Sequence, residues 1–411
     1  MIDRPSNHLG ISPATPPVDF RVAIDVSAVH RSSGGVLRYV QELVRHLPGQ
    51  RVSPVLIDQR DRPEDPRRRL FDATADTTVL GVAPTSRLPR LAWEQLALTR
   101  TVGRLNDVSV LHSPHYTMPR GPAGLDRLAR KRRHRHAPAS VVTIHDLTFF
   151  SLPELHHASK RYLFQSAIRF AAHHADALVC VSDRTASLLR HHVDVRVPVF
   201  VAPHGIDAVR FAPPSGETRE SDARVLDRLG VRQPYVFWLG AIAPHKNLGN
   251  LLQAFDRVQR SNEPAGLSLV IGGQSWPGAW EAVAHLAGAA VQRIGFVGED
   301  DVAPLLRNAA VFAYPSIEEG FGLPVLEALA CGTAVLTTEH SVMDDLTGGL
   351  ATVVDARSVE ALADGLRRAL DATDSDRVAR VARARTFTWE KSAVKHVEAY
   401  RVAIGRSRGT M

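Results

Sequence analysis

Apolar residues follow two alternating spacings along this chain, and the alternation restricts the fold more than any other feature of the sequence. Short runs rich in Val, Ile and Leu are typical of buried strands. Longer stretches with an apolar residue every three or four positions are typical of amphipathic helices. Strands that alternate with helices predict βαβ units, which build parallel sheets covered by helices. The sequence therefore predicts an α/β fold.

Two such series follow one another along the chain. In the first, we predict strands at 20–26, 52–57, 108–111, 141–144, 177–181 and 199–202, with the clearest helices at 37–47, 91–105 and 160–174. In the second, we predict strands at 235–239, 267–271, 291–294, 311–314 and 334–337, with helices at 248–259, 302–308, 324–330 and 359–370. A terminal helix is predicted at 389–404. Two series in tandem indicate a pair of doubly wound domains.

The domain boundaries follow from length and local composition. A chain of 411 residues is too long for one ordinary hydrophobic core, so two domains are expected. A polar segment with Pro-Pro and Gly separates the two series and predicts a linker. We therefore expect a disordered lead-in at 1–18, a first domain at 19–211, a linker at 212–222, a second domain at 223–388 and a C-terminal helix at 389–411. This helix is a candidate for packing back on the first domain.

Charge and cysteine content limit which cellular compartments and which binding partners are expected. The formal net charge is +7, but six basic residues lie in one run: Arg127, Arg130, Lys131, Arg132, Arg133 and Arg135. Without interleaved aromatic residues this run does not indicate nucleic acid, and 127–135 predicts a solvated loop or a contact with anionic membrane. Two isolated cysteines and the absence of an apolar run of membrane-spanning length indicate the cytoplasm, or the inner face of the membrane.

The segment 314–332 carries the strongest chemical signal. A predicted strand ends in a loop with Gly320 and Gly322, and Pro324 then suits the start of a helix. Unpaired backbone N–H groups at such a helix start bind phosphate well. Glu319 and Glu327 flank this position, and because a carboxylate repels phosphate, we predict that they accept hydrogen bonds from hydroxyl groups. A capped surface helix with two solvated acids is the alternative interpretation of the same segment.

Glu-x7-Glu within Glu-Gly-Phe-Gly-Leu-Pro-Val-Leu-Glu-Ala-Leu-Ala-Cys-Gly-Thr resembles the donor-site signature of glycosyltransferase family 4. Shorter segments along the chain also resemble sequence segments that are typical of that family. They include Gly34-Gly35-Val-Leu-Arg38-Tyr39, Trp93-Glu94-Gln95, Thr143-Ile-His145-Asp146, Pro203-His204-Gly205 and Pro244-His245-Lys246-Asn247. The resemblance extends in outline from about residue 20 to residue 402.

This resemblance implies a GT-B fold, in which two Rossmann-like domains face each other across a cleft. It implies that the first domain binds a hydroxyl acceptor and the second binds a nucleoside-diphosphate sugar. It also implies retention of the anomeric configuration, no cofactor, and no metal bridging the diphosphate. The donor-binding residues that it implies are Gly35, Gly240, His245, Lys246, Phe296, Val297, Glu319, Gly320, Phe321, Gly322, Leu323 and Glu327.

Three residues, Lys246, His145 and Glu319, are expected to take part in the chemistry itself. Lys246 is the candidate that stabilises negative charge on the departing diphosphate. By the resemblance, His145 lies against the donor sugar, and Glu319 orients that sugar. An isolated strand-end histidine more often bonds to the backbone, so the family match is what favours a functional role for His145. The chain departs from the family at Ala241 and His245, where many members carry arginine, so one phosphate contact is expected to be weaker.

No residue in the sequence stands out as an enzymic nucleophile. The resemblance therefore favours a front-face route, in which the departing phosphate oxygen takes the proton of the acceptor. The only Asp-x-Asp string, at 374–376, is polar and far from the glycine loop, so we predict that it lies on the surface.

Three other classes of function compete with this one. A sugar-nucleotide epimerase or hydrolase on the same fold is the main alternative. A dehydrogenase is disfavoured because no Gly-x-Gly-x-x-Gly follows the first strand. A nucleic-acid-binding protein lacks support beyond the basic run. The sequence leaves open the base of the nucleotide (UDP- and GDP-sugars are the leading candidates), the sugar, the acceptor, the linkage and the oligomeric state.

Overall fold

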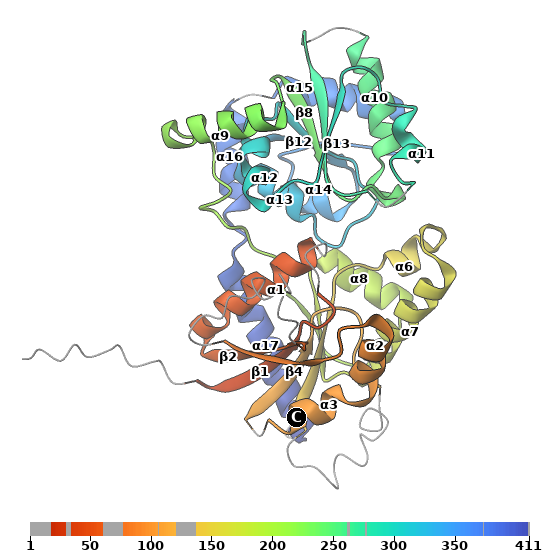
Figure 1. Ribbon diagram of the computed structural model, residues 1–411, viewed down its shortest axis with the longest axis vertical. Helices are drawn as coiled ribbons and strands as arrows, with labels where there is room; N and C mark the ends of the chain where they lie inside the picture. Colours follow the sequence, from red (N-terminus) through yellow and green to blue (C-terminus); the bar gives the residue numbers. More distant parts are fainter. Residues whose placement is uncertain are drawn as a thin grey trace, which may run out of the picture.

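The computed structural model describes residues 18–29, 34–60, 77–105, 107–120, 137–260, 264–275, 278–372 and 374–409. Two lobes are stacked along its long axis, each with a parallel sheet between helices (Figure 1). Nearly all of the predicted lead-in at 1–18, and the whole basic run at 127–135, fall outside the described residues. No described helix is long and apolar enough to cross a membrane.

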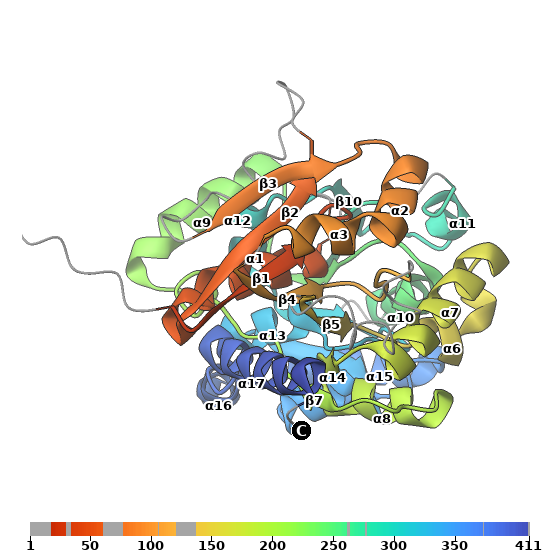
Figure 2. The same ribbon diagram turned by 90° about the horizontal axis from the view of Figure 1, so that it is seen from below.

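The first sheet has the strand order β3-β2-β1-β4-β5-β6-β7, and every pairing in it is parallel. Its strands are β1 (Phe20–Asp25), β2 (Val52–Gln59), β3 (Thr78–Ala83), β4 (Val108–Ser113), β5 (Ala139–Ile144), β6 (Ala177–Cys180) and β7 (Val199–Val201). Helices α1 (Gly35–His46), α2 (Arg87–Leu96), α3 (Leu98–Gly103), α6 (Thr148–Ser151), α7 (Ala158–His174) and α8 (Asp183–His192) connect them. Figure 2 shows this sheet from below.

The second sheet has the order β10-β9-β8-β11-β12-β13 and is also parallel. Its strands are β8 (Tyr235–Leu239), β9 (Ser268–Gly272), β10 (Val291–Gly295), β11 (Val311–Tyr314), β12 (Ala334–Thr338) and β13 (Thr352–Val354). Its helices are α9 (Gly216–Leu229), α10 (Leu248–Gln259), α11 (Glu281–Ala284), α12 (Glu299–Asn308), α13 (Leu323–Ala330), α14 (Val342–Thr347), α15 (Val359–Leu370) and α16 (Asp374–Ala384). The predicted α/β fold of two doubly wound sheets is confirmed.

The last helix, α17 (Trp389–Arg408), leaves the second lobe and packs on the first sheet. In Figure 1 it lies in the lower lobe, where it packs against β4, β5, β6 and β7, whereas α16 stays in the upper lobe. Tyr400 and His396 on this helix are fully buried there. The chain thus crosses between the lobes twice, once before α9 and once before α17.

Two predictions differ from the structure by more than a few residues at an element's end. The predicted linker at 212–222 is wrong for its second half, because residues 216–222 belong to α9. Ser215 and Thr218 form a capping box at the start of this helix, and buried Asp222 pairs with Arg307 of α12 at 2.7 Å. The single helix predicted at 91–105 is divided at Ala97. This division lets α3 bury its own apolar face while α2 turns polar side chains inward.

Candidate functional site

The loop between β11 and α13 leads into a helix start of the kind that can bind an anion. Gly322 caps α13 with φ +94°, a left-handed conformation that favours glycine. Leu323 is the first helical residue and Pro324 the second, so the helix begins one residue earlier than the sequence predicts. The N–H groups in the first turn of a helix have no partner within the helix, and the helix dipole adds partial positive charge there. This end of α13 can therefore hold a phosphate.

Lys246 and Glu319 meet beside this loop. The Lys246 Nζ lies 2.5 Å from Glu319 Oε1 and 2.6 Å from the Tyr314 hydroxyl, and the Ser316 hydroxyl also donates to Glu319 Oε1 at 2.5 Å. Burial lowers the pKa of Lys246, but the Glu319 carboxylate and the Tyr314 phenol raise it by more, so the ammonium stays charged. Within the described residues, Glu319 Oε2 is left as the oxygen that can accept from a ligand hydroxyl.

His245 supports the loop through its backbone. Its carbonyl oxygen accepts from Ile317 N at 2.8 Å and from the Ser316 hydroxyl at 3.1 Å. Burial and the neighbouring Lys246 lower the pKa of its imidazole, so this side chain is neutral at pH 7. It therefore does not replace the cation that an arginine would supply, in keeping with the expected weaker phosphate contact.

Gly320 joins the two lobes. Its carbonyl oxygen accepts hydrogen bonds from the hydroxyls of Ser182, at 2.7 Å, and Thr185, at 3.1 Å, which lie at the start of α8 in the first lobe. A Cβ on Gly320 would lie 1.5 Å from the backbone oxygen of His145. The loop that carries Glu319 and Gly320 is therefore pressed against the carboxyl edge of the first sheet, and only a residue without a side chain fits there.

His145 lies at the end of β5 and bonds to the backbone. Its Nε2 contacts the Pro114 carbonyl oxygen at 2.7 Å, so this nitrogen carries the proton. Burial lowers the pKa of His145, which leaves the ring neutral and Nδ1 as a hydrogen-bond acceptor. Tyr39 packs edge-on against it at 5.1 Å between ring centroids. The structure thus brings His145 to the donor loop through its backbone but holds its Nε2 on Pro114.

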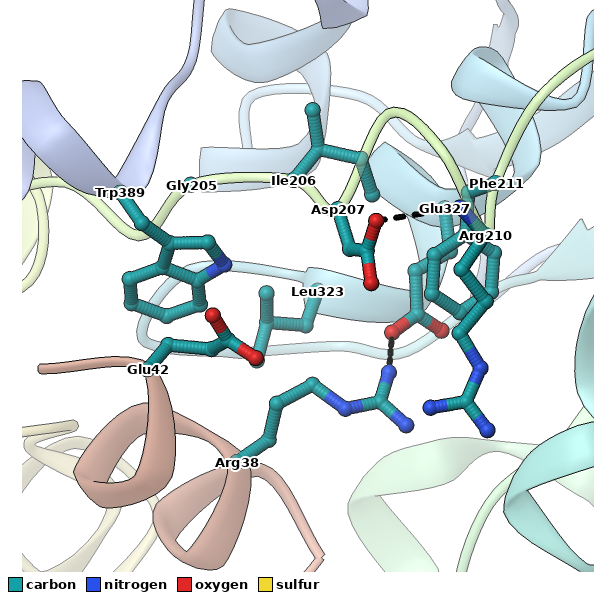
Figure 3. Close-up of a pocket in the computed structure, with 10 residues that line it drawn as sticks. All are labelled: Arg38, Glu42, Gly205, Ile206, Asp207, Arg210, Phe211, Leu323, Glu327 and Trp389. Carbon is teal, nitrogen blue, oxygen red and sulfur yellow. Dashed lines mark hydrogen bonds and ion pairs between the residues drawn. The ribbon is translucent and has the colours of Figure 1, made fainter. Parts of the chain in front are cut away.

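Glu327 lies in a different part of the cleft. It is 3% exposed and forms an ion pair with Arg38 of α1, so it ties α13 to the first lobe. Figure 3 shows this pair in a pocket that is also lined by Asp207, Arg210 and Trp389. Gly35, at the start of α1, faces Leu323, since a Cβ on it would lie 3.6 Å from Leu323 Cδ1. Glu319, in the loop before α13, and Glu327, inside α13, therefore lie in different surroundings.

The remaining predicted donor residues follow strands of the second sheet. Gly240 follows β8, and its carbonyl approaches Gly273, where a Cβ would lie 2.0 Å from it. Gly273, with φ +124°, is a close-approach position that sequence reasoning missed, although Gly272-Gly273 was a visible signal. Phe296 is 67% exposed after β10, while Val297 is buried. Phe321 is buried and packs edge-on against His204 at 4.9 Å, so it supports the loop.

Comparison with known proteins gives matches across both lobes. Residues 33–210 match the model for "Glycosyltransferase Family 4", and residues 226–386 match the model for "Glycosyl transferases group 1". The chain belongs to glycosyltransferase family 4. The resemblance seen in the sequence is thereby confirmed, and its two facing Rossmann-like lobes are the GT-B fold.

Two relatives and one solved structure illustrate what this family 4 chain is similar to. It is 26% identical to the O-antigen chain mannosyltransferase B of Escherichia coli over 390 residues, which cover 90% of this chain and 96% of the relative. It is 32% identical to the D-inositol 3-phosphate glycosyltransferase of Salinispora tropica over 259 residues, covering 57% and 52%. Its fold matches Anabaena HepE, solved with UDP and glucose, with TM-score 0.67 and 16% identity, covering 92% and 98%.

The family 4 glycosyltransferase also contains buried polar groups that sequence reasoning missed. Asp25, Glu94 and His115 lie together at the carboxyl edge of the first sheet. Their positions in the sequence gave no spacing signal, because they come from β1, α2 and the loop after β4. Arg38 belongs to the motif Gly34–Tyr39, but its partner Glu327 is 289 residues away along the chain. Both groupings are visible only once the chain is folded.

A chain of hydrogen bonds inside the first lobe joins α17 to the sheet. The Tyr39 hydroxyl bonds to His396 Nε2 at 2.7 Å and to Thr143 Oγ1 at 2.9 Å, and Thr143 Oγ1 bonds to His112 Nε2 at 2.8 Å. The Tyr400 hydroxyl bonds to His112 Nδ1 at 2.8 Å. Burial lowers the pKa of His396 to about 4 and that of His112 well below its usual value. Both rings are therefore neutral in the folded enzyme.

These neutral histidines make stability depend on pH. An unfolded histidine takes up a proton near pH 6.5, whereas His396 in the folded state does so near pH 4. The unfolded state therefore binds more protons in this window, and the unfolding free energy falls as the pH drops from about 6.5 to 4, by about 1.4 kcal/mol per pH unit for each such histidine. Urea unfolding at pH 7.5, 6.5 and 5.5 measures this slope. His396→Gln should reduce it by about one proton, and a slope unchanged by that variant would contradict the assignment.

Proposed function

We propose that this enzyme transfers a hexosyl group from a nucleoside-diphosphate sugar to a hydroxyl acceptor, with retention of configuration. The observation that carries the proposal is that charged Lys246 pairs with Glu319 in the loop that leads into α13. A diphosphate placed there has a cation on one side and a helix dipole on the other. The adjoining sugar would then lie between Glu319 and the end of β5, where His145 is found.

The proposed reaction needs no enzymic nucleophile. The bond between the anomeric carbon and the diphosphate oxygen breaks, and its electron pair stays on the diphosphate. The acceptor oxygen bonds to the anomeric carbon from the same face and gives its proton to the departing phosphate oxygen. Lys246 stabilises the charge that develops on that oxygen. Glu319 orients the sugar through Oε2, and the neutral Nδ1 of His145 accepts from a sugar or acceptor hydroxyl.

Similarity favours a mannosyl group and a glycan acceptor, because one relative that aligns over nearly its whole length is an O-antigen chain mannosyltransferase. UDP and GDP are the leading candidates for the nucleotide, and we propose that Glu327 bonds to its ribose after exchanging partners with Arg38. The two free, buried cysteines favour a reducing cytoplasm as the compartment.

The nucleotide can be identified by thermal unfolding against UDP, GDP, ADP, CDP and dTDP in the presence of EDTA. A ligand at about 100 times its dissociation constant stabilises the folded state by about 2.7 kcal/mol. We expect a clear rise in melting temperature with one of these nucleotides. The rise should disappear in Lys246→Ala and Glu327→Ala and persist in the control Lys391→Ala, an exposed lysine on α17. No rise with any nucleotide would contradict the proposed donor site.

Turnover of the donor then separates transfer from the alternative activities. The identified sugar nucleotide is incubated with and without candidate glycan acceptors, and free sugar, epimerised donor and glycoside are measured. Product that requires an acceptor supports the transferase. Equal consumption of donor without any acceptor supports a hydrolase or epimerase on the same fold.

A further inference from the structure

A group of buried polar side chains lies apart from the donor loop, at the carboxyl edge of the first sheet. One ligand-type atom from each of Asp25, Glu94 and His115 lies within 4.8 Å of the other two. Asp25 is the last residue of β1, Glu94 is on α2, and His115 follows β4. Both carboxyl side chains are 1% exposed. Three separate elements therefore bring two carboxyl oxygens and one imidazole nitrogen together.

The hydrogen bonding of this group is incomplete. Asp25 Oδ1 accepts from Ser27 N at 3.1 Å, but Asp25 Oδ2 and His115 Nδ1 are buried and have no partner among the described residues. Leaving buried polar atoms unpaired costs free energy, about 1–3 kcal/mol for each atom. Asp25 and His115 each carry an unpaired buried atom and belong to a group whose ligand-type atoms lie within 4.8 Å of one another, which favours a bound species that completes their coordination.

The charge balance favours a positive occupant. Asp25 and Glu94 bring two buried carboxyl groups together, and Arg90 lies one turn before Glu94 on α2. A cation held between the two carboxyl groups would allow both of them to be ionised. The guanidinium of Arg90 also has an unpaired, buried Nη1, which can donate to a water held by the occupant. Buried charges in proteins are paired or coordinate metal ions.

We propose that Asp25, Glu94 and His115 bind a divalent cation. The spacing of the three atoms leaves room for an ion rather than for a sugar ring. A set of two carboxylates and one imidazole suits Mn²⁺ or Zn²⁺ better than Mg²⁺ or Ca²⁺, which prefer oxygen alone. This site is distinct from the proposed donor diphosphate site, and the proposal does not depend on which donor the enzyme uses.

The ion would affect the reaction centre indirectly, by fixing the turn that holds His145. His115 directly follows Pro114, whose carbonyl oxygen receives the Nε2 hydrogen bond of His145. An ion held by His115, Asp25 and Glu94 would fix this turn against β1 and α2. It would thereby fix the orientation of the His145 ring, so that these three residues act as positioning residues rather than as catalytic ones.

Metal binding can be tested directly on the untagged, full-length enzyme. The protein is treated with EDTA, dialysed, and equilibrated with MnCl₂ or ZnCl₂, and bound metal is measured by mass spectrometry. We expect about one equivalent of tightly bound ion and a rise in melting temperature. Asp25→Asn and Glu94→Gln should each weaken binding at least about 10-fold. The control Glu339→Gln, an exposed carboxylate outside the cluster, and Lys246→Met should leave it unchanged.

A second measurement uses the wild type alone, so it does not depend on how the variants fold. Electron spin resonance of the Mn²⁺-loaded enzyme should detect coupling to a histidine nitrogen. Failure to bind either ion, or binding unaffected by both carboxylate variants, would overturn the proposal. Binding that is lost in Lys246→Met but retained in Asp25→Asn would place the ion at the donor site instead and also overturn it.

Discussion

Replacing Lys246 with methionine is expected to lower the kcat of sugar transfer by about 100- to 1,000-fold. Lys246 is the cation that lies against Glu319 beside the start of α13, at 2.5 Å from Oε1. Removing a preorganised group that stabilises charge in the transition state commonly costs this much. The variant also leaves Glu319 without its ion pair, so its unfolding free energy should fall. Steady-state transfer assays with the identified donor, together with melting temperatures, measure both effects.

Two control variants separate charge from stability in this experiment. Lys246→Arg keeps the positive charge, so it should recover part of the lost rate. Lys391→Met removes an exposed lysine of α17 and should leave kcat unchanged. If Lys246→Met folds and still transfers sugar within about threefold of the wild-type rate, another group neutralises the leaving diphosphate.

Gly320→Ala is expected to reduce transfer at least about 100-fold while nucleotide binding is largely preserved. The new Cβ would overlap the His145 backbone oxygen, which cannot move aside as a flexible side chain can. The loop would shift away from the first lobe and lose its bonds to Ser182 and Thr185. A displacement of about 1 Å between reacting groups can cost about two orders of magnitude in rate. Lys246 and Glu327 lie in the second lobe, so they should still hold the nucleotide.

The comparison variant for Gly320→Ala is Gly216→Ala, because a Cβ at Gly216 meets no atom within 4 Å. It should retain full activity and stability. The readouts are kcat, the thermal shift given by the nucleotide, and small-angle scattering to detect separation of the lobes. Wild-type transfer by Gly320→Ala would show that the close contact between the lobes is not needed for the reaction.

The sequence predicts buried elements of this fold much better than exposed or polar ones. The predicted bounds of β8, β11, α10 and α15 agree with the structure to the residue, because each buries a continuous or regularly spaced apolar set. Strand β3 was missed because its residues are largely exposed at the edge of the sheet. Helix α9 was missed because its stability comes from caps and from the Asp222 ion pair rather than from apolar periodicity.

The residues of the candidate site likewise fall into those that the sequence predicts and those that it does not. The residues of 319–327 and Lys246 could be named because they lie in short motifs, where glycine, proline and charge carry local meaning. The Glu327–Arg38 pair, the bond from His145 to Pro114, and the group of Asp25, Glu94 and His115 could not be predicted. Each joins residues from separate strands or from separate lobes, and no periodicity links their positions in the sequence.

The return of α17 to the first sheet has a consequence for how this protein is made. Domains generally fold in order as they emerge from the ribosome. The first lobe emerges early but lacks the side chains of His396 and Tyr400, which bond to Tyr39 and His112 in its interior. Its core is completed only when α17 has been synthesised, after the whole second lobe. We therefore expect that a fragment ending at 211 does not fold on its own, and that the interior of the first lobe stays incomplete during synthesis until α17 emerges.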